Sequence, residues 1–543
     1  MNRTKEKFYR LIADGISLPY KADQNEALGI AAKKLRRSLG NAAKSATLSV
    51  YRRSVDARRK DDIRFVYTIL AEFEQGILYD KERLLSEGFR VDSQKEIEYE
   101  YGTEKSEHRP IVVGCGPAGM YCALMLAEQG YRPILIERGE SLADRIKSVE
   151  VFFAGGDLNT ESNVMFGAGG AGTFSDGKLV TRINDPLCRY VLTRLCDFGA
   201  PGEILSKAKP HIGTDLLQGV VTNLLGKVID CGGEIIYNCR MDVLSHNSDG
   251  SVTVRTSRGD ICGSCVVLAV GHSARDTYEY LNAQGYSMIA KPFSVGVRVE
   301  HLRSDIEYGL YGEHAGDPLL GAAEYALSDT KSGRGVYTFC MCPGGEVIAA
   351  ASERGGIVVN GMSHHARDGV NSNSAVAVSI RPEDYDGTPM GAIKYQRDLE
   401  NRAFLLGGGN YTAPIETMGD FLKDKKSFLS SPDRIKPSYT RELVKVCDIS
   451  QVFPKYVNDE LRRGFVSFGK RLPGFDSPDA VLTAVESRTS APIRILRTES
   501  GYSATDRNVY PCGEGAGYAG GITSAAVDGI KTALEIIKRF SPN

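Results

Sequence analysis

The stretch from Arg109 to Arg138 constrains the fold of this chain more than any other part of the sequence. A short, β-branched apolar run leads into Gly114, Gly116 and Gly119, which fill the positions of a G-x-G-x-x-G motif. A segment rich in alanine and leucine follows, and a second apolar run then ends at Glu137. This order predicts a strand–helix–strand unit in a parallel sheet, of the kind that binds dinucleotides.

Each residue type in this motif has a physical role in binding a pyrophosphate. Gly114 permits the tight turn, Gly116 lets the backbone approach the phosphates, and Gly119 lets the helix pack closely on the strand. The helix N-terminus offers free amides and the positive end of its dipole to the phosphates, and Glu137 is placed to accept hydrogen bonds from ribose hydroxyls. The alternative is a glycine-rich turn without a ligand, but the complete order of elements favours a dinucleotide site.

Composition narrows the class of protein. The 543 residues include 67 basic and 68 acidic side chains, and the formal net charge of −1 argues against a nucleic-acid or membrane partner. No apolar run reaches the roughly 20 residues of a membrane-spanning helix, and the N-terminus leads into no signal-peptide core. The 12 cysteines form no disulfide framework, so we expect a cytoplasmic protein.

Two pairs of cysteines stand close together in the sequence. Cys340 and Cys342 form a C-x-C motif, and Cys262 and Cys265 form a C-x-x-C motif. Neither pair has the matching second pair of a zinc site, so we expect no metal centre. A redox disulfide between Cys262 and Cys265 is one interpretation, but their position between two strand-like runs favours an ordinary turn.

The pattern of apolar runs predicts an α/β protein with a small N-terminal α+β domain. A charged run at 52–62 in that domain is either an anion or partner site or, as we favour, a solvated hairpin tip. After the first glycine motif, helices near 186–198 and 214–231 precede strand-like runs at 234–237, 241–246 and 252–257. We interpret this part as a meander that is followed by a return strand at 264–270. The chain is predicted to have four segments. Residues 1–105 form the N-terminal domain with its linker, and residues 106–290 form the first part of the nucleotide-binding domain. Residues 291–484 form an inserted substrate or cap domain, and residues 485–543 form the C-terminal part of the nucleotide-binding domain.

A glycine-rich run occupies residues 163–178. So many glycines cannot form a stable helix or a central strand. The alternatives are a flexible loop and a ligand loop, and the flanking Phe166 and Phe174 favour the ligand loop.

The inserted segment reads as a mostly antiparallel sheet that carries helices. Strand-like runs occur at 295–300, 336–342 and 346–351, and Pro343–Gly345 is typical of a hairpin loop between the last two. The glycines at 407–409 lack a strand–turn–helix context, so we do not interpret them as a second dinucleotide site.

The chain finishes with a second strand–glycine–helix unit, at 509–537. Together the two units resemble the glutathione-reductase-like flavoprotein superfamily. In that group the first unit holds the ADP half of FAD, and the second approaches the ribityl chain and the flavin. The resemblance implies FAD as cofactor and a Rossmann-type FAD-binding domain, with a central parallel sheet plus a β-meander, interrupted by the inserted domain.

A narrower resemblance covers nearly the whole chain. The runs at 166–179, 291–298, 337–345, 486–497 and 510–522 look like the uncharacterised bacterial FAD-dependent dehydrogenases. The motif and the two resemblances together give the following candidate FAD-binding residues: Gly114, Gly116, Pro117, Ala118, Gly119, Glu137, Arg138, Gly170, Ser175, Asp176, Gly177, Lys178, Met241, Gly271, Gly513, Glu514, Gly521, Ile522 and Thr523.

An FAD enzyme needs no Ser-His-Asp or metal constellation, because the flavin ring performs the redox chemistry. We therefore expect a dehydrogenase or reductase that acts on a small organic substrate. His272 is the favoured histidine for proton transfer, and the alternative is a surface or capping histidine. Arg488 and Arg494 either clamp an anionic substrate or form structural ion pairs.

Two other functions stay open at this point. The sequence shows no second Rossmann unit for NAD(P)H, but a nicotinamide can dock transiently as a reductant. An NAD(P)H-dependent flavin monooxygenase is therefore the first alternative. The second is a non-catalytic flavoprotein or an RNA- or protein-binding module that uses residues 1–105.

Overall fold

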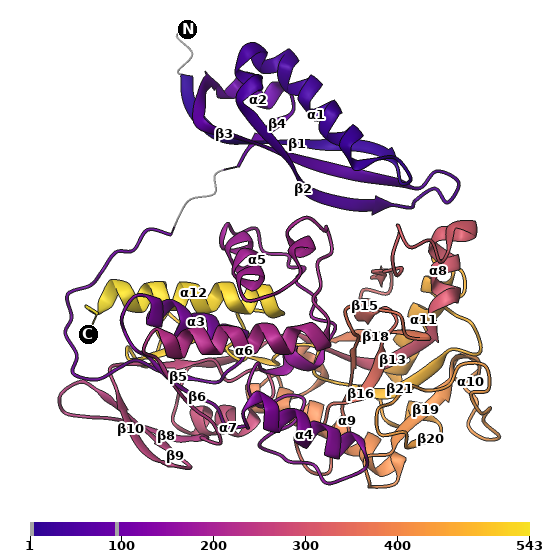
Figure 1. Ribbon diagram of the computed structural model, residues 1–543. Helices are drawn as coiled ribbons and strands as arrows, with labels where there is room; N and C mark the ends of the chain where they lie inside the picture. The colour runs from indigo at the N-terminus through magenta and orange to yellow at the C-terminus, as the bar shows by residue number, and fades with distance from the viewer. Residues whose placement is uncertain (1–4, 93–96, 543) are drawn as a thin grey trace.

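Five short parallel strands form the sheet that carries the first glycine motif. The computed structural model describes residues 5–92 and 97–542, and the strand order in this sheet is β23-β11-β5-β6-β7 (Figure 1). All neighbouring strands pair in parallel. The strands are β5 (Ile111–Val113), β6 (Ile134–Ile136), β7 (Glu234–Ile236), β11 (Val266–Leu268) and β23 (Val509–Pro511). The predicted Rossmann-type parallel sheet is confirmed, and its strand β23 comes from the C-terminal end of the chain.

The two faces of this sheet are covered by different kinds of element (Figure 1). Helices α3, α5, α6 and α12 share one apolar cluster with the sheet, and the meander and α7 share another. The helices are α3 (Pro117–Glu128), α4 (Leu142–Phe153), α5 (Leu187–Asp197), α6 (Thr214–Asp230), α7 (Arg275–Ala283) and α12 (Ile522–Arg539). The meander strands are β8 (Met241–His246), β9 (Val252–Thr256) and β10 (Gly259–Gly263). A meander and the return strand are thus present, but the run at 234–237 is β7 of the parallel sheet, and the meander strand β10 was not predicted.

Helices α3 and α12 lie unusually close together. A Cβ atom added to Gly529 of α12 would lie 2.1 Å from the carbonyl oxygen of Ala118 in α3. Only glycine permits this approach, because the opposing atoms belong to backbone and cannot rotate away. The contact holds the two ends of the nucleotide-binding domain together across some 400 residues of intervening chain.

The N-terminal domain is a four-stranded antiparallel sheet with helices on one face (Figure 1). Its elements are β1 (Lys5–Pro19), α1 (Gln24–Leu39), β2 (Ala46–Asp56), β3 (Arg64–Asp80), α2 (Lys81–Ser86) and β4 (Phe89–Val91). The apolar pieces at 8–12 and 16–18 belong to one strand, β1, which changes register between Ala13 and Ile16. Asp23 caps α1, and the helix buries Ala27, Ala31 and Leu35.

The charged run at 52–62 covers the end of β2 and the tip of the β2–β3 hairpin. Its cations pair with neighbouring carboxylates: Arg58 lies 2.6 Å from Asp56, and Arg59 lies 3.1 Å from Asp61. Arg58 and Arg59 are both solvent-exposed. These contacts favour the solvated hairpin over a site for nucleic acid or another anion.

The inserted segment is built on a seven-stranded sheet of order β14-β15-β18-β13-β21-β19-β20, antiparallel except for the pair β19–β20. Its strands are β13 (Phe293–Leu302), β14 (Ser328–Asp329), β15 (Val336–Cys342), β18 (Asn371–Ile380), β19 (Ala413–Thr417), β20 (Val444–Val446) and β21 (Val481–Glu486). Its helices are α8 (Arg303–Tyr311), α9 (Pro389–Gly407), α10 (Met418–Leu422) and α11 (Lys455–Gly469). The short strands β12 (Met288–Ala290) and β22 (Ile493–Ile495) pair with each other where the chain enters and leaves this segment.

The predicted hairpin at Pro343–Gly345 is wrong. Strand β15 pairs with β18, whereas β16 (Glu346–Ala349) pairs with β17 (Val359–Met362) in a separate two-stranded sheet. The reason is a close contact of Gly344 with a distant turn. Its carbonyl accepts a hydrogen bond from the amide of Gly369 at 3.2 Å, and a Cβ at Gly344 would lie 2.0 Å from the carbonyl oxygen of Arg367.

Helices in the described part of the chain do not have the length and apolar character that a bilayer span requires.

We expect the substitution Gly529→Ala to lower the free energy of unfolding by about 1–3 kcal/mol, because the added methyl group forces α12 away from α3. Urea-induced unfolding of the purified protein measures the change. Gly226→Ala in α6 is the matched control, since a Cβ there meets no atom within 4 Å. That control should gain up to about 1 kcal/mol from the better helix former. Equal midpoints for the two variants would contradict the packing argument.

Candidate functional site

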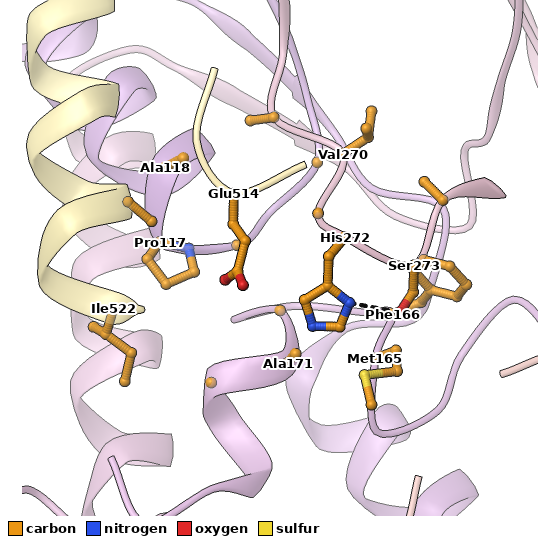
Figure 2. A pocket seen from close by; sticks show the side chains of 18 of the residues that line it. Pro117, Ala118, Met165, Phe166, Ala171, Val270, His272, Ser273, Glu514 and Ile522 are labelled. Atoms are coloured by element: carbon orange, nitrogen blue, oxygen red, sulfur yellow. Dashed lines mark hydrogen bonds between the residues drawn. The ribbon is translucent and has the colours of Figure 1, made fainter. Parts of the chain in front are cut away.

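A cavity of about 310 Å³ lies at the carboxyl ends of β5, β6 and β11. Ligands bind at this edge of open α/β sheets. The glycine-rich run at 163–178 and the inserted sheet complete its walls, and Figure 2 shows part of the lining. The sequence-predicted residues that line it are Gly114, Gly116, Pro117, Ala118, Glu137, Arg138, Gly170, Ser175, Asp176, Gly177, Lys178, Met241, Gly271, His272, Arg488, Glu514, Gly521 and Ile522. Four predicted residues lie outside the lining: Gly119, Arg494, Gly513 and Thr523.

The first glycine motif packs against the glycine-rich loop. Gly114 has a φ of +103°, and a Cβ at Gly119 would lie 1.9 Å from the carbonyl oxygen of Gly114. Gly119 therefore permits the close contact between β5 and α3, although it does not itself line the cavity. A Cβ at Gly170 would lie 2.8 Å from the Cα of Gly116, so the two loops meet through glycine backbone. This contact leaves a cradle without side chains beside the first turn of α3.

Glu137 fixes the loops around this cradle. Its carboxylate accepts hydrogen bonds from the backbone amides of Cys115 at 2.7 Å, Gly139 at 2.9 Å and Gly167 at 3.0 Å. The side chain is buried and also lines the cavity. A residue predicted from its spacing to bind ribose thus holds together three separate segments around the cavity.

Arg138 and Met241, the first residue of the meander strand β8, line the cavity together with Glu137. The guanidinium of Arg138 lies 4.3 Å from the ring centroid of Phe166. It forms ion pairs with Glu161 and Asp276, each at 3.0 Å. The positive charge of Arg138 is therefore already balanced by these carboxylates.

The second glycine unit brings the first turn of α12 to the cavity. Gly521 and Ile522 line it, while the hydroxyl of Thr523 donates a hydrogen bond to the carbonyl of Leu179 at 2.8 Å. Gly513 has a φ of +74°, and a Cβ there would lie 2.6 Å from the Cβ of Ala118. Gly513 and Thr523 thus position this unit against its neighbours.

The carboxylate of Glu514 points into the cavity (Figure 2). Within the described residues, the hydrogen bonds include none to its side-chain oxygens. Burial raises the pKa of Glu514 to about 7, although the nearby charge of Lys291 acts in the opposite direction. A buried carboxylate that has no hydrogen-bond partner in the protein is suited to accept a hydrogen bond from a hydroxyl group of a ligand.

His272 also lines the cavity (Figure 2). Burial, together with the charges of Arg488 and Arg275, lowers the pKa of His272 to about 4. The imidazole is therefore neutral near pH 7. Its Nδ1 lies 2.9 Å from the hydroxyl oxygen of Ser273. A neutral ring held in this way supplies a hydrogen bond to a ligand rather than a charge.

The contacts of Arg488 are those of a structural ion pair. Its Nε and Nη2 atoms lie 3.0 and 2.9 Å from the two carboxylate oxygens of Glu400. Arg275 contacts both oxygens of the same carboxylate at 2.8 Å. Arg494 donates to the carbonyl of Gly517 at 3.1 Å, away from the cavity. Of the two interpretations of these arginines, the structure favours the structural one.

Asp176 and Lys178 also pair within the protein. Asp176 is fully buried and accepts hydrogen bonds from Lys178, Ser363 and Arg367. Burial acts to raise the pKa of Asp176, but the nearby cations of Lys178 and Arg367 lower this pKa to about 2.

Sequence reasoning missed three residues that the inserted segment contributes to the cavity, Phe339, Cys340 and Asn360, and also Thr489 just after that segment. The C-x-C motif was the one signal in the sequence that pointed to this wall. Among the described residues, groups of three or more His, Cys, Asp or Glu side chains suited to a metal ion are absent.

We expect Glu514→Gln to flatten the pH dependence of stability in protein freed of flavin. The raised pKa means that the folded state keeps a proton which the unfolded state loses between about pH 4 and 7. The stabilisation is complete below that interval and disappears as the pH rises through it. Between pH 5 and 8 the wild type should lose roughly 1–3 kcal/mol more than Glu514→Gln in urea unfolding. The exposed Glu499→Gln variant should behave like the wild type.

We expect Arg488→Ala to lower the free energy of unfolding by about 3 kcal/mol, since Glu400 loses one of its two buried cations. Urea unfolding measures this loss. The variant Arg494→Ala gives the comparison, because it removes an arginine that lies outside the cavity. Unchanged stability of Arg488→Ala would revive the interpretation that this side chain is a substrate clamp.

Three family descriptions match parts of the chain. The family described as FAD-dependent protein, C-terminal domain-like matches residues 292–489, and the NAD(P)-binding Rossmann-like domain matches residues 112–176. A domain of unknown function matches residues 15–72.

Solved structures show more distant similarity. Aklavinone-11 hydroxylase with FAD and aklavinone is 14% identical, with 80% of this chain and 63% of that chain covered and a TM-score of 0.34. Halogenase PltM with phloroglucinol and FAD is 11% identical, with coverages of 80% and 68% and a TM-score of 0.34. The amino acid oxidase NikD is 11% identical, with coverages of 79% and 94% and a TM-score of 0.32. At these TM-scores the similarities assign no reaction to this chain.

A much nearer relative is an uncharacterized protein of Clostridium beijerinckii. It is 45% identical over 525 residues, which make up 95% of this chain and 97% of the relative. The similarity extends over the Rossmann-like region and the FAD-dependent C-terminal region alike. The chain therefore belongs to the same family as the Clostridium beijerinckii protein.

Proposed function

We propose that this protein is an FAD-dependent dehydrogenase or reductase that acts on a small organic substrate in the cavity at the sheet edge. One observation supports this most strongly: helix N-termini from both ends of the nucleotide-binding domain, α3 and α12, meet at one cavity with an unpartnered carboxylate between them. The placement in the glutathione-reductase-like superfamily stays a prediction.

The residues present fit FAD. The cradle of Gly116 and Gly170 leaves room for a pyrophosphate beside the α3 amides. Glu137 and Met241 would hold the adenosine end, and Glu514 would accept a hydrogen bond from a ribityl hydroxyl. Bound FAD supplies the redox step by accepting or donating two electrons through its ring.

The protein's own part in the reaction is binding, orientation and control of charge. The first turn of α12, at Gly521 and Ile522, favours negative charge at its end of the cavity. His272 is neutral and offers a hydrogen bond to the substrate without adding charge.

The two arginines do not support the hypothesis that the substrate is an anion. Arg488 is neutralised by Glu400, and Arg494 lies outside the cavity. Lys178 in the wall is likewise paired with Asp176. We therefore propose a small organic substrate without requiring a carboxylate.

The visible absorbance spectrum of the purified protein tests this proposal. We expect a bound-flavin spectrum, and a loss of FAD affinity of about tenfold or more in Gly116→Val, whose side chain occupies the cradle, corresponding to about 1.4 kcal/mol. Gly219→Ala in α6, where a Cβ meets no atom within 4 Å, is the matched control. Protein that takes up no flavin even after incubation with FAD would overturn the proposal.

Adding NADH or NADPH without oxygen then separates the reaction classes. A flavin that bleaches identifies a reductase supplied by a nicotinamide. A flavin that stays oxidised identifies a dehydrogenase with an organic donor. Substrate-dependent oxygen consumption with NAD(P)H would instead identify a monooxygenase.

A further inference from the structure

Two cysteines stand together where the inserted sheet meets the cavity. Cys340 lines the cavity and is partly exposed, whereas Cys342 is fully buried behind it. Both lie at the end of β15 and carry free thiols. Neither has a part in the function proposed above.

The backbone brings the two residues into reach of each other. Phe339 pairs with Ala375, and Cys342 pairs with Asn373. Between these two pairs β15 advances by three residues, whereas β18 advances by two. The extra residue makes a bulge, and Cys340 within it has a φ of +44°. Two residues along an extended chain span at most about 7 Å. Disulfides join Cα atoms up to about 6.8 Å apart. The Cα atoms of the two residues are therefore within or close to the range that a disulfide joins, and the sulfur of Cys342 lies 3.4 Å from the carbonyl oxygen of Cys340.

The electrostatic surroundings make the two thiols unequal. A hydrogen bond from the Cys342 thiol, with the charges of Arg298 and Lys178, lowers the pKa of Cys340 to about 6. The same hydrogen bond and burial raise the pKa of Cys342 well above its ordinary value. The more exposed sulfur is thus the thiolate, and its neighbour is the thiol that a second step would use.

Arg298 and Glu486 complete the group beneath the pair. Arg298 donates to the carbonyl of Cys340 at 2.8 Å and lies 3.6 Å from the sulfur of Cys342. Its Nη1 atom is 3.2 Å from Glu486, whose pKa is raised to about 7 by burial. A carboxylate that titrates near neutrality is suited to take up or return a proton when the thiols change state.

We propose that Cys340 and Cys342 are a redox-active dithiol–disulfide pair that exchanges two electrons with FAD in the adjoining cavity. In the oxidising direction the S–H bond of Cys342 breaks and its sulfur bonds to the thiolate sulfur of Cys340, while two electrons and the one released proton pass to oxidised FAD. The reverse direction consumes reduced FAD and restores the thiol and the thiolate. The pair thus gives the flavin a disulfide or thiol partner inside the same chain, and its role rests on the proposed function because FAD is the other reactant.

The other close pair of cysteines is unsuited to this role. Cys262 is exposed on the meander strand β10, outside the cavity, and burial raises the pKa of Cys265 to about 12. Cys262→Ser is therefore the matched control for any experiment on the C-x-C pair.

An anaerobic titration of the air-oxidised holoprotein with dithionite tests the proposal. The wild type and Cys262→Ser should consume one two-electron equivalent per FAD more than Cys340→Ser and Cys342→Ser do. Peptide mapping gives an independent readout, because the tryptic peptide 335–354 contains both cysteines and no others. We expect this peptide to carry an internal disulfide, with a mass lower by two hydrogens, before the titration and two alkylatable thiols after it.

The outcomes separate the two proposals. Protein without flavin overturns the proposed function and the role of the pair with it. Protein that binds FAD, but whose peptide 335–354 carries two free thiols both before and after reduction, overturns the redox pair alone. Equal consumption of dithionite by the wild type and Cys340→Ser would also overturn the redox pair. Because the peptide is measured in the wild type, this test does not depend on the stability of the variants.

Discussion

The contact between α3 and α12 is the constraint on which the rest of the nucleotide-binding domain depends. Gly529 lies against the backbone of Ala118 at a distance that no side chain permits. That contact brings the first turns of both helices to the same sheet edge, one from each end of the domain. The cavity exists because these two segments, far apart in the sequence, share one packed surface.

Buried charges set the position of the inserted sheet against this domain. Asp176 from the glycine-rich loop pairs with Arg367 at 2.5 Å, and Arg275 pairs with Glu400 at 2.8 Å. Each pair joins the nucleotide-binding domain to the inserted segment. Such pairs add little net stability when fully desolvated, but breaking one is costly. Their effect here is to fix the geometry of the wall that carries Phe339 and Cys340.

Local signals, together with the family resemblance, were enough to predict the parallel sheet, a meander and somewhat less than half of the residues that line the cavity. Gly119 packs against Gly114 of its own motif, so the motif alone reveals its role, whereas a Cβ at Gly114 would lie 2.3 Å from the carbonyl oxygen of the distant Ala269. The hairpin at Pro343–Gly345 was wrong because the partner of β15 is β18, nearly 40 residues further along the chain. The roles of Arg488 and Glu400 could not be predicted for the same reason, since their pairing depends on the tertiary fold and leaves no local pattern.

The ribbon formed by β12 and β22 determines how the inserted segment is attached. Ala290 and Ile493 are cross-strand partners, so the chain leaves the nucleotide-binding domain and returns to it at neighbouring positions. An insertion anchored in this way places no strain on the sheet that holds it. The segment between these residues can therefore change in sequence and length, and with it the substrate wall, while the geometry of cofactor binding is inherited unchanged.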